Sequence, residues 1–258
     1  MRLLFIKMIV LFMLILTACS HSSNEVIVYC TVDQVFSEPI LRDFEKETGI
    51  KVKAVYDTEE TKSTGVMNRL IAEKDNPQCD VFWSGDPVRN SVLQTNGITD
   101  SYQSEQTNLI AEYFKEKDNN WTGFSARARV LIYNKNLIAT DSLPQSVFDF
   151  TDPAYKGEFA IANPLFGTTT FHIAALFVNL GDEKAKQWMN DLKANGVVIA
   201  ASNGDVKKRV MNGELAFGLT DTDDAFEAQK ESDAVDFVFL DQQGSDIGTL
   251  IMPNALSL

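Results

Sequence analysis

The sequence has few of the residues on which most catalytic and metal sites depend. Its 258 residues include two histidines, His21 and His172, and three cysteines. It has no HExxH motif, no cysteine–histidine pair and no phosphate-cradling lysine loop, so the common zinc, thiol and nucleotide chemistries have no basis here. His172 starts an apolar segment, where we expect it to be packed rather than catalytic. A hydrolase that uses paired carboxylates stays open as an alternative.

Positive charge is also scarce. The chain has 23 lysines and arginines against 36 aspartates and glutamates, which gives a formal net charge of −13 at pH 7. Binding to nucleic acid depends on clustered lysine and arginine side chains that contact the phosphates. We therefore expect no nucleic-acid partner.

Long apolar runs are confined to the start of the chain. Residues 8–16 form an unbroken apolar run after a basic start, and this run is too short to span a bilayer as a stable helix. Small residues then precede Cys19, and the whole arrangement resembles a bacterial lipoprotein signal. We predict a signal peptide over 1–18, a lipid on Cys19, a tether over 19–24, and a protein anchored in the periplasm or at the cell surface. A plain secretory signal with a chance cysteine is the alternative.

The other two cysteines are predicted to be unpaired. Cys30 ends the first expected strand, whereas Cys79 just precedes the third. In a parallel sheet these positions lie toward opposite ends of neighbouring strands, and a disulfide needs Cα atoms within about 7 Å.

Beyond residue 24 the chain alternates between strand-like and helix-like patterns. Apolar segments rich in β-branched residues or with period two predict strands at 26–29, 50–56, 81–83, 159–162, 197–200, 216–219 and 237–240. The segments between them carry helical spacing with glycine or capping residues at their ends. Successive β-α-β units imply an α/β protein with mainly parallel sheets and right-handed crossovers.

The first of these helices is expected to begin at Ser37, which would cap it, and to end at Gly49. Its spacing predicts that Ile40, Leu41 and Phe44 face the core.

Residues 121–134 determine how we divide the chain. Apolar and polar side chains alternate along this segment, which predicts a strand between two α/β runs. We interpret residues 126–134 as a hinge strand that joins a first lobe, 25–125, to a second lobe, 135–246. An ordinary central strand of one large sheet is the alternative.

A second crossing is predicted near the end of the chain. Residues 247–258 are extended in pattern and would return toward the first lobe. No helix follows to cover this apolar strand, so we expect the chain to be cut short, with the remainder of a two-lobed protein missing.

The loops at the strand ends are the candidate site. In open parallel sheets, ligands bind beyond the carboxyl ends of the strands. This rule selects the loops 31–34, 57–64, 84–86, 163–170, 202–205 and 220–224, and the hinge adds Arg127 and Arg129.

Two chemistries coexist in these loops. Hydroxyl groups and backbone N–H groups at helix N-termini attract anions, and they come from Ser63, Thr64, Ser84, Thr168 and Thr169. Carboxylates at the same edge favour a hard metal ion or an amine, and they come from Asp33, Asp221, Asp223 and Asp224. Helix capping and a solvated acidic loop are the alternatives. Arg127 and Arg129 would either clamp an anionic ligand or pair with these acids.

Several stretches together carry a family resemblance. They are 33–39 (DQVFSEP), 44–49 (FEKETG), 80–85 (DVFWSG), 121–127 (WTGFSAR), 163–170 (NPLFGTTT), 216–224 (AFGLTDTDD) and 248–250 (GTL). As a set they resemble the periplasmic solute-binding proteins of ABC importers, in the iron(III)-type group. The resemblance implies a two-lobed type II periplasmic-binding-protein fold. It also implies a monomer that closes on a small solute and delivers it to a membrane permease, without catalysis.

The resemblance also assigns residues. Iron-binding members hold the metal with two adjacent tyrosines after the strand matching 216–219, and the residues here are Asp223 and Asp224. Their histidine in the first loop corresponds to Asp33. The implied metal ligands are thus Asp223 and Asp224, with iron(III) or another hard cation as cargo and no resident cofactor. A zwitterion such as an aminoalkylphosphonate is one alternative, and a degenerate lipoprotein without a transport role is another.

Overall fold

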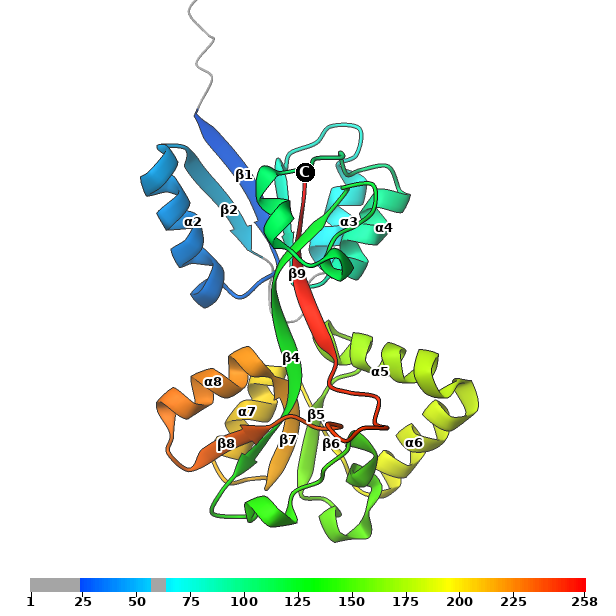
Figure 1. The fold of residues 1–258 in the computed structure, drawn as a ribbon. Helices are drawn as coiled ribbons and strands as arrows, with labels where there is room; N and C mark the ends of the chain where they lie inside the picture. Colours follow the sequence, from blue (N-terminus) through cyan, green and yellow to red (C-terminus); the bar gives the residue numbers. More distant parts are fainter. Residues whose placement is uncertain (1–23, 57–63) are drawn as a thin grey trace, which may run out of the picture.

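The computed structural model describes residues 24–56 and 64–258, and it has the expected α/β character (Figure 1). The predicted signal peptide, Cys19 and Ser63 lie outside the described residues. The strands are β1 Glu25–Cys30, β2 Lys51–Tyr56, β3 Val81–Ser84, β4 Thr122–Asn134, β5 Phe159–Ala162, β6 Val198–Ala200, β7 Phe217–Asp221, β8 Val235–Val238 and β9 Ile251–Ser257. The α-helices are α2 Gln34–Thr48, α3 Thr64–Ala72, α4 Pro87–Thr95, α5 Gly167–Leu180, α6 Asp182–Ala194, α7 Asn203–Met211 and α8 Thr222–Glu231. Short 3-10 helices fill the connections.

Two groups of parallel strands are joined by two long antiparallel ones. β2, β1 and β3 are parallel neighbours, and so are β6, β5 and β7. β4 and β9 run antiparallel between the groups, because β9 pairs with β3 and with β4, and β4 pairs with β7. Figure 1 shows two bodies connected by these two strands. We call the body with β1–β3 and α2–α4 the first half, and the body with β5–β8 and α5–α8 the second half.

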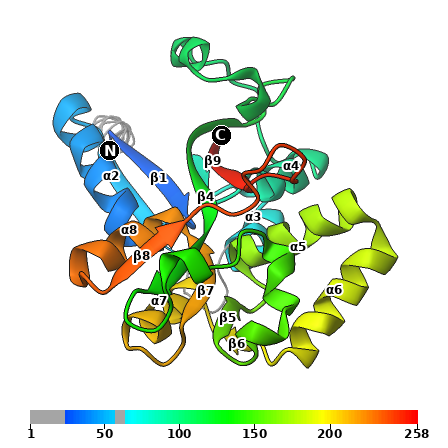
Figure 2. The ribbon, with the colours of Figure 1, turned by 60° about the horizontal axis from the view of Figure 1, so that its bottom comes forward.

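The second half has a core on each face of its sheet. Leu131 and Tyr133 of β4 pack with the α5 and α6 side chains Leu176 and Trp188. The alternate residues of β4 face the other way, toward α7 and α8. Figure 2 shows the same division, with α5 and α6 on one side of the strands and α7 and α8 on the other. This alternation is the period of two that the sequence shows.

In the first half, α3 and α4 cover one face of the sheet. Leu70 of α3 and Leu93 of α4 pack on Tyr29 and Phe82. On the opposite face, Leu41 of α2 packs against a cluster that includes Trp83. The helix α2, which connects β1 to β2, and the helix α3, which connects β2 to β3, thus lie on opposite faces of the sheet, as expected for a doubly wound sheet.

The prediction for the start of α2 was wrong. The helix begins at Gln34, and Ser37 lies buried in its first turn, where its hydroxyl donates to the carbonyl of Asp33 at 3.0 Å instead of capping the helix. Leu41 packs inward as predicted, but Ile40 and Phe44 are 54% and 39% exposed. The helix therefore buries a narrower stripe than the apolar spacing suggested.

The two cysteines of the described residues are both unpaired, Cys30 buried and Cys79 half-buried. The Cys79 thiol is 3.1 Å from the carbonyl oxygen of Val81. In the part of the chain that the structure describes, none of the helices has the length and apolar character needed to cross a bilayer.

Candidate functional site

A cavity of about 110 Å³ is lined by loops from both halves. From the first half it receives Thr31, Val32, Asp33 and Gly85, and from β4 it receives Arg127. From the second half come Ala162, Asn163, Phe166, Gly167, Thr168, Ala201, Ser202, Asn203, Gly204, Asp221, Asp223 and Asp224. Apart from Arg127, these residues lie at the carboxyl ends of parallel strands, in the loops that follow them or in the first turns of the next helices, which is where the strand-end rule placed the candidate site.

Local structure explains how the two sides of the cavity are held. In the first half, the Thr31 hydroxyl accepts a hydrogen bond from the backbone N–H of Gly85 at 2.9 Å, which ties the loop after β1 to the loop after β3. In the second half, Ser202 caps α7 by accepting from the N–H of Asp205 at 3.1 Å. Asp223 and Asp224 lie in the first turn of α8, directly after β7.

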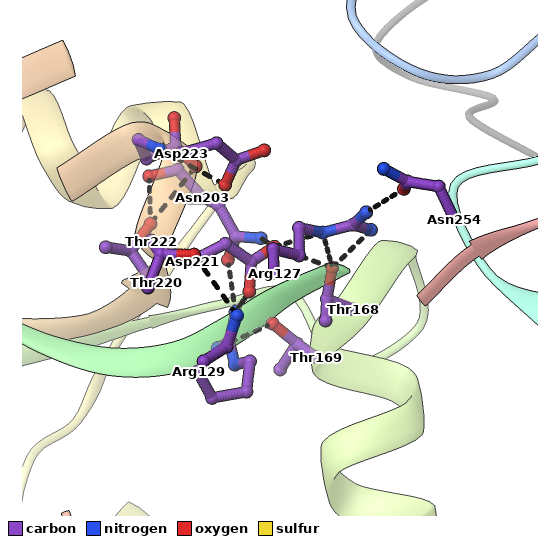
Figure 3. A network of polar contacts seen from close by, with 12 residues as sticks. Arg127, Arg129, Thr168, Thr169, Asn203, Thr220, Asp221, Thr222, Asp223 and Asn254 are labelled. Carbon is purple, nitrogen blue, oxygen red and sulfur yellow. Dashed lines mark hydrogen bonds and ion pairs between the residues drawn. The ribbon is translucent and has the colours of Figure 1, made fainter. Parts of the chain in front are cut away.

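Asp221 is the centre of a buried polar network (Figure 3). Its Oδ1 accepts from Nη1 of Arg129 at 2.8 Å. Its Oδ2 accepts from Nε of Arg127 at 3.1 Å, from the Thr168 hydroxyl at 2.7 Å and from the Asn203 amide at 2.9 Å. Burial opposes ionisation, but the guanidinium groups of Arg129 and Arg127 outweigh it and hold the pKa of Asp221 below its usual range.

Arg127 links the network to both crossing strands. It projects from β4, and its Nη1 donates to Oδ1 of Asn254 in β9 at 2.8 Å, while its Nη2 donates to the Thr168 hydroxyl at 3.0 Å. Each nitrogen of its guanidinium therefore has a partner within the protein. Of the two roles that the sequence left open for the arginines, pairing with local acids is the one found.

The pKa values of Asp223 and Asp224 are shifted upward, in the opposite direction from that of Asp221. Burial raises the pKa of Asp223, and the negative charge of Asp221 adds to this effect. For Asp224, burial and then repulsion from Asp223 and Asp221 raise the pKa to about 7. Its Oδ2 accepts from the Thr220 hydroxyl at 3.2 Å. The raised pKa values mean that the ionised forms of both carboxylates are disfavoured at the wall of the cavity. A positively charged ligand would stabilise these ionised forms.

A complete protein-derived metal site is not present among residues 24–56 and 64–258, where no three His, Cys, Asp or Glu side chains are grouped closely enough to hold an ion. His172 is buried in α5, and its burial lowers its pKa to about 3, with a further contribution from Arg129. It is therefore neutral and packed, as expected from the sequence.

The structure brings together part of the set predicted from the sequence. The cavity lining includes Asp33, Arg127, Thr168, Asp221, Asp223 and Asp224. Three others do not reach it. Ser84 is fully buried and accepts from the N–H of Asp86. Thr169 is buried and accepts from Arg129, and Thr64 accepts from Arg89 at the start of α3. Ser63 lies outside the described residues.

Two asparagines of the network were not predicted. Asn203 lies in one of the selected loops, yet an amide after a capping serine has no distinctive pattern. Asn254 lies within β9, where the sequence gives no sign that its side chain meets Arg127.

Comparison with known proteins shows clear similarity. The sequence profile of the bacterial extracellular solute-binding protein family matches residues 40–257. Iron uptake protein A1 of Synechocystis is 30% identical over 69% of this chain and 49% of its own length. The major ferric iron-binding protein of Neisseria meningitidis is 24% identical over 79% of this chain and 60% of its own length. The chain thus spans about half to three-fifths of these relatives.

A solved structure with the same arrangement of elements is that of iron-bound HitA from Pseudomonas aeruginosa. It superimposes with a TM-score of 0.81 at 25% identity, and the match covers 91% of this chain and 74% of that one.

Proposed function

The chain belongs to the family of bacterial extracellular solute-binding proteins, and on that premise we propose that it captures a small cationic solute for an ABC importer. Its fold is the two-lobed type II fold of periplasmic binding proteins, as the sequence resemblance implied. In proteins of this kind the two lobes exchange between open and closed arrangements, and a ligand that contacts both lobes shifts the population toward closure.

The observation that carries this proposal is the acidic cavity between the halves. Asp33 comes from the first half and Asp223 and Asp224 from the second, and all three line the same cavity. The positive charge of Arg127 is already engaged by Asp221. Asp223 and Asp224, whose pKa values are raised, favour a hard cation or an amine over a free anion.

Ferric iron is the first candidate cargo. The similar proteins from Synechocystis and Neisseria are named for iron uptake and ferric iron binding. We propose that Asp223 and Asp224 contribute oxygen ligands, and that small oxygen ligands bound with the metal complete its coordination. A solute with an amine group is the second candidate, because the described residues offer fewer than three grouped metal-binding side chains.

A direct test is to dialyse the protein against ferric citrate and to measure bound iron by plasma mass spectrometry. We expect about one iron per chain, and D223N/D224N should lose most of it. The matched control is D182N/E183Q, which removes two exposed carboxylates from the first turn of α6. Equal iron in both double variants would remove ferric iron as the cargo, and titration with amine solutes would then test the second candidate.

We also propose that Cys19 is acylated and holds the protein at the membrane. Incorporation of labelled palmitate into the wild-type chain, lost in C19S, would support this. A C19S chain that stays in the membrane fraction with full label would contradict it.

A further inference from the structure

The carboxylate of Asp221 has the surroundings expected for a bound anionic ligand. Only 3% of the residue is exposed, and four side chains from three elements, β4, α5 and α7, donate to its two carboxylate oxygens. The donors are two guanidinium groups, a hydroxyl and an amide, and the hydroxyl is that of Thr168 in the first turn of α5 (Figure 3). Guanidinium groups together with a helix N-terminus are the usual protein environment for a bound carboxylate or phosphate.

The position of Asp221 in the chain makes this placement unusual. It is the N-cap residue of α8, where an aspartate normally accepts a hydrogen bond from the backbone of the first turn. Its side chain makes no such bond here and turns toward Arg127 and Arg129 instead. Three of the features that predicted an anionic ligand from the sequence, Thr168 and the two arginines, therefore bind a carboxylate of the protein itself.

We propose that Asp221 is a built-in anion, which fills the only cationic pocket found in the described part of the cavity wall and so restricts the site to cationic solutes. The proposal rests on the assignment of this cavity as the solute site. A phosphate or phosphonate would find both arginines engaged and would face Asp33, Asp223 and Asp224. The nearby ammonium of Lys207 is also paired, with Glu227 and Glu231. The aminoalkylphosphonate considered from the sequence is thus disfavoured.

The alternative is that Asp221 only holds the second half together. Both roles predict that removing the carboxylate destabilises the protein, because the buried guanidinium group of Arg129 and the half-buried one of Arg127 would lose their shared partner. Only the built-in anion predicts that the vacated pocket then binds an anion from solution.

The experiment is a titration with inorganic phosphate, read by calorimetry and by thermal denaturation, on the wild type, D221A and D221N. We expect no detectable binding by the wild type. D221A should gain affinity on the order of tenfold or more, since charged hydrogen bonds to Arg127 and Arg129 become available, and its melting temperature should rise with phosphate. D221N, which keeps the shape of the side chain, should show a smaller gain.

The matched control is D241A. Asp241 is another buried carboxylate, 4% exposed, but its partners are the Ser146 hydroxyl and the backbone N–H of Val147 rather than arginines. Its removal should destabilise the chain without any response to phosphate. The variant D221A/R127Q should lose the gain.

Folded D221A and D221N that bind phosphate no better than the wild type would overturn the proposal, and so would an equal gain in D241A. If the variants are recovered unfolded, their refolding yields with and without phosphate are compared. A higher yield with phosphate supports the proposal, and an unchanged yield overturns it. The phosphate titration does not depend on iron binding by the wild type. A negative titration would therefore count against the built-in anion and not against ferric iron as the cargo.

Discussion

Arg129 and Asp221 face each other across the antiparallel pair of β4 and β7, with Nη1 of the arginine 2.8 Å from Oδ1 of the aspartate. Their side chains are 1% and 4% exposed. An ion pair at this depth is screened little by solvent, and loss of one member leaves a buried charge without its main partner.

We predict that R129M lowers the free energy of unfolding by about 3 kcal/mol. The control is K186M, because Lys186 makes surface ion pairs within α6 and is 55% exposed, so its loss should cost less than about 1 kcal/mol. Urea denaturation followed by circular dichroism measures both. Similar stabilities for the two variants would show that the buried pair contributes little.

This pair also shows where prediction from the sequence ends. Arg127, Arg129 and Asp221 were all identified as candidates, since each lies at a strand end or on the crossing strand. Their mutual pairing depends on the register of β4 against β7, which brings Arg129 opposite a residue 92 positions away. Local patterns carry no information on that register, so the sequence left pairing with nearby acids as one of two roles for the arginines and could not name Asp221 as their common acceptor.

The elements themselves were largely predictable. β5 has the predicted bounds, and α5 ends at Leu180 before Gly181, whose positive φ of 79° suits a helix end. The start of α2 was missed because the Ser37 hydroxyl donates backward to the carbonyl of Asp33, the residue just before the helix, an option that competes with capping for every serine. Periodicity identified an apolar stripe on α2 but could not tell how much of it the fold covers.

A second stability prediction concerns close packing of β7 on α7. A Cβ atom added to Gly218 would collide with Cγ1 of Val206 and would lie 3.1 Å from the carbonyl oxygen of Ala160. We expect G218A to lose about 1–3 kcal/mol, as for other overpacked cores. G244A is the control, because nothing lies within 4 Å of its added Cβ, and its stability should change by less than about 0.5 kcal/mol. If G218A unfolds at the same urea concentration as G244A, the strand and helix are less tightly packed than described.

The raised pKa of Asp224 predicts how stability depends on pH. Its pKa is about 7 in the folded protein, mainly because of burial, against about 3.9 in an unfolded chain. Between these values the folded state holds a proton that the unfolded state releases, so this group lowers stability as the pH rises from about 4 to about 7. Relative to the wild type, D224N should therefore have a higher free energy of unfolding, and this difference should be about 1–2 kcal/mol larger at pH 8 than at pH 5.

Urea midpoints of the wild type, D224N and the exposed control D182N at the two pH values check this prediction. The stabilisation of D224N should grow with pH, and D182N should follow the wild type. An advantage of D224N that is the same at both pH values would mean that Asp224 titrates in the folded protein much as it does in the unfolded chain.

The same carboxylates predict the pH dependence of cation binding. A cation binds best when Asp223 and Asp224 are ionised, and both carboxyl groups have raised pKa values. A cation must therefore displace a proton below neutral pH, which weakens its apparent affinity as the pH falls. With one proton displaced, affinity falls about tenfold per pH unit below the pKa of Asp224.

Calorimetric titration with terbium(III), a hard cation that prefers oxygen ligands, measures this effect. We expect binding to be roughly 25-fold weaker at pH 5.5 than at pH 7.5, and the heat to depend on the ionisation enthalpy of the buffer, because protons are released. In D223N/D224N both the affinity and the proton release should fall, whereas D182N/E183Q should behave as the wild type. Binding that is strong at both pH values without proton release would place the cation away from Asp223 and Asp224, and the acidic cavity would then need another role.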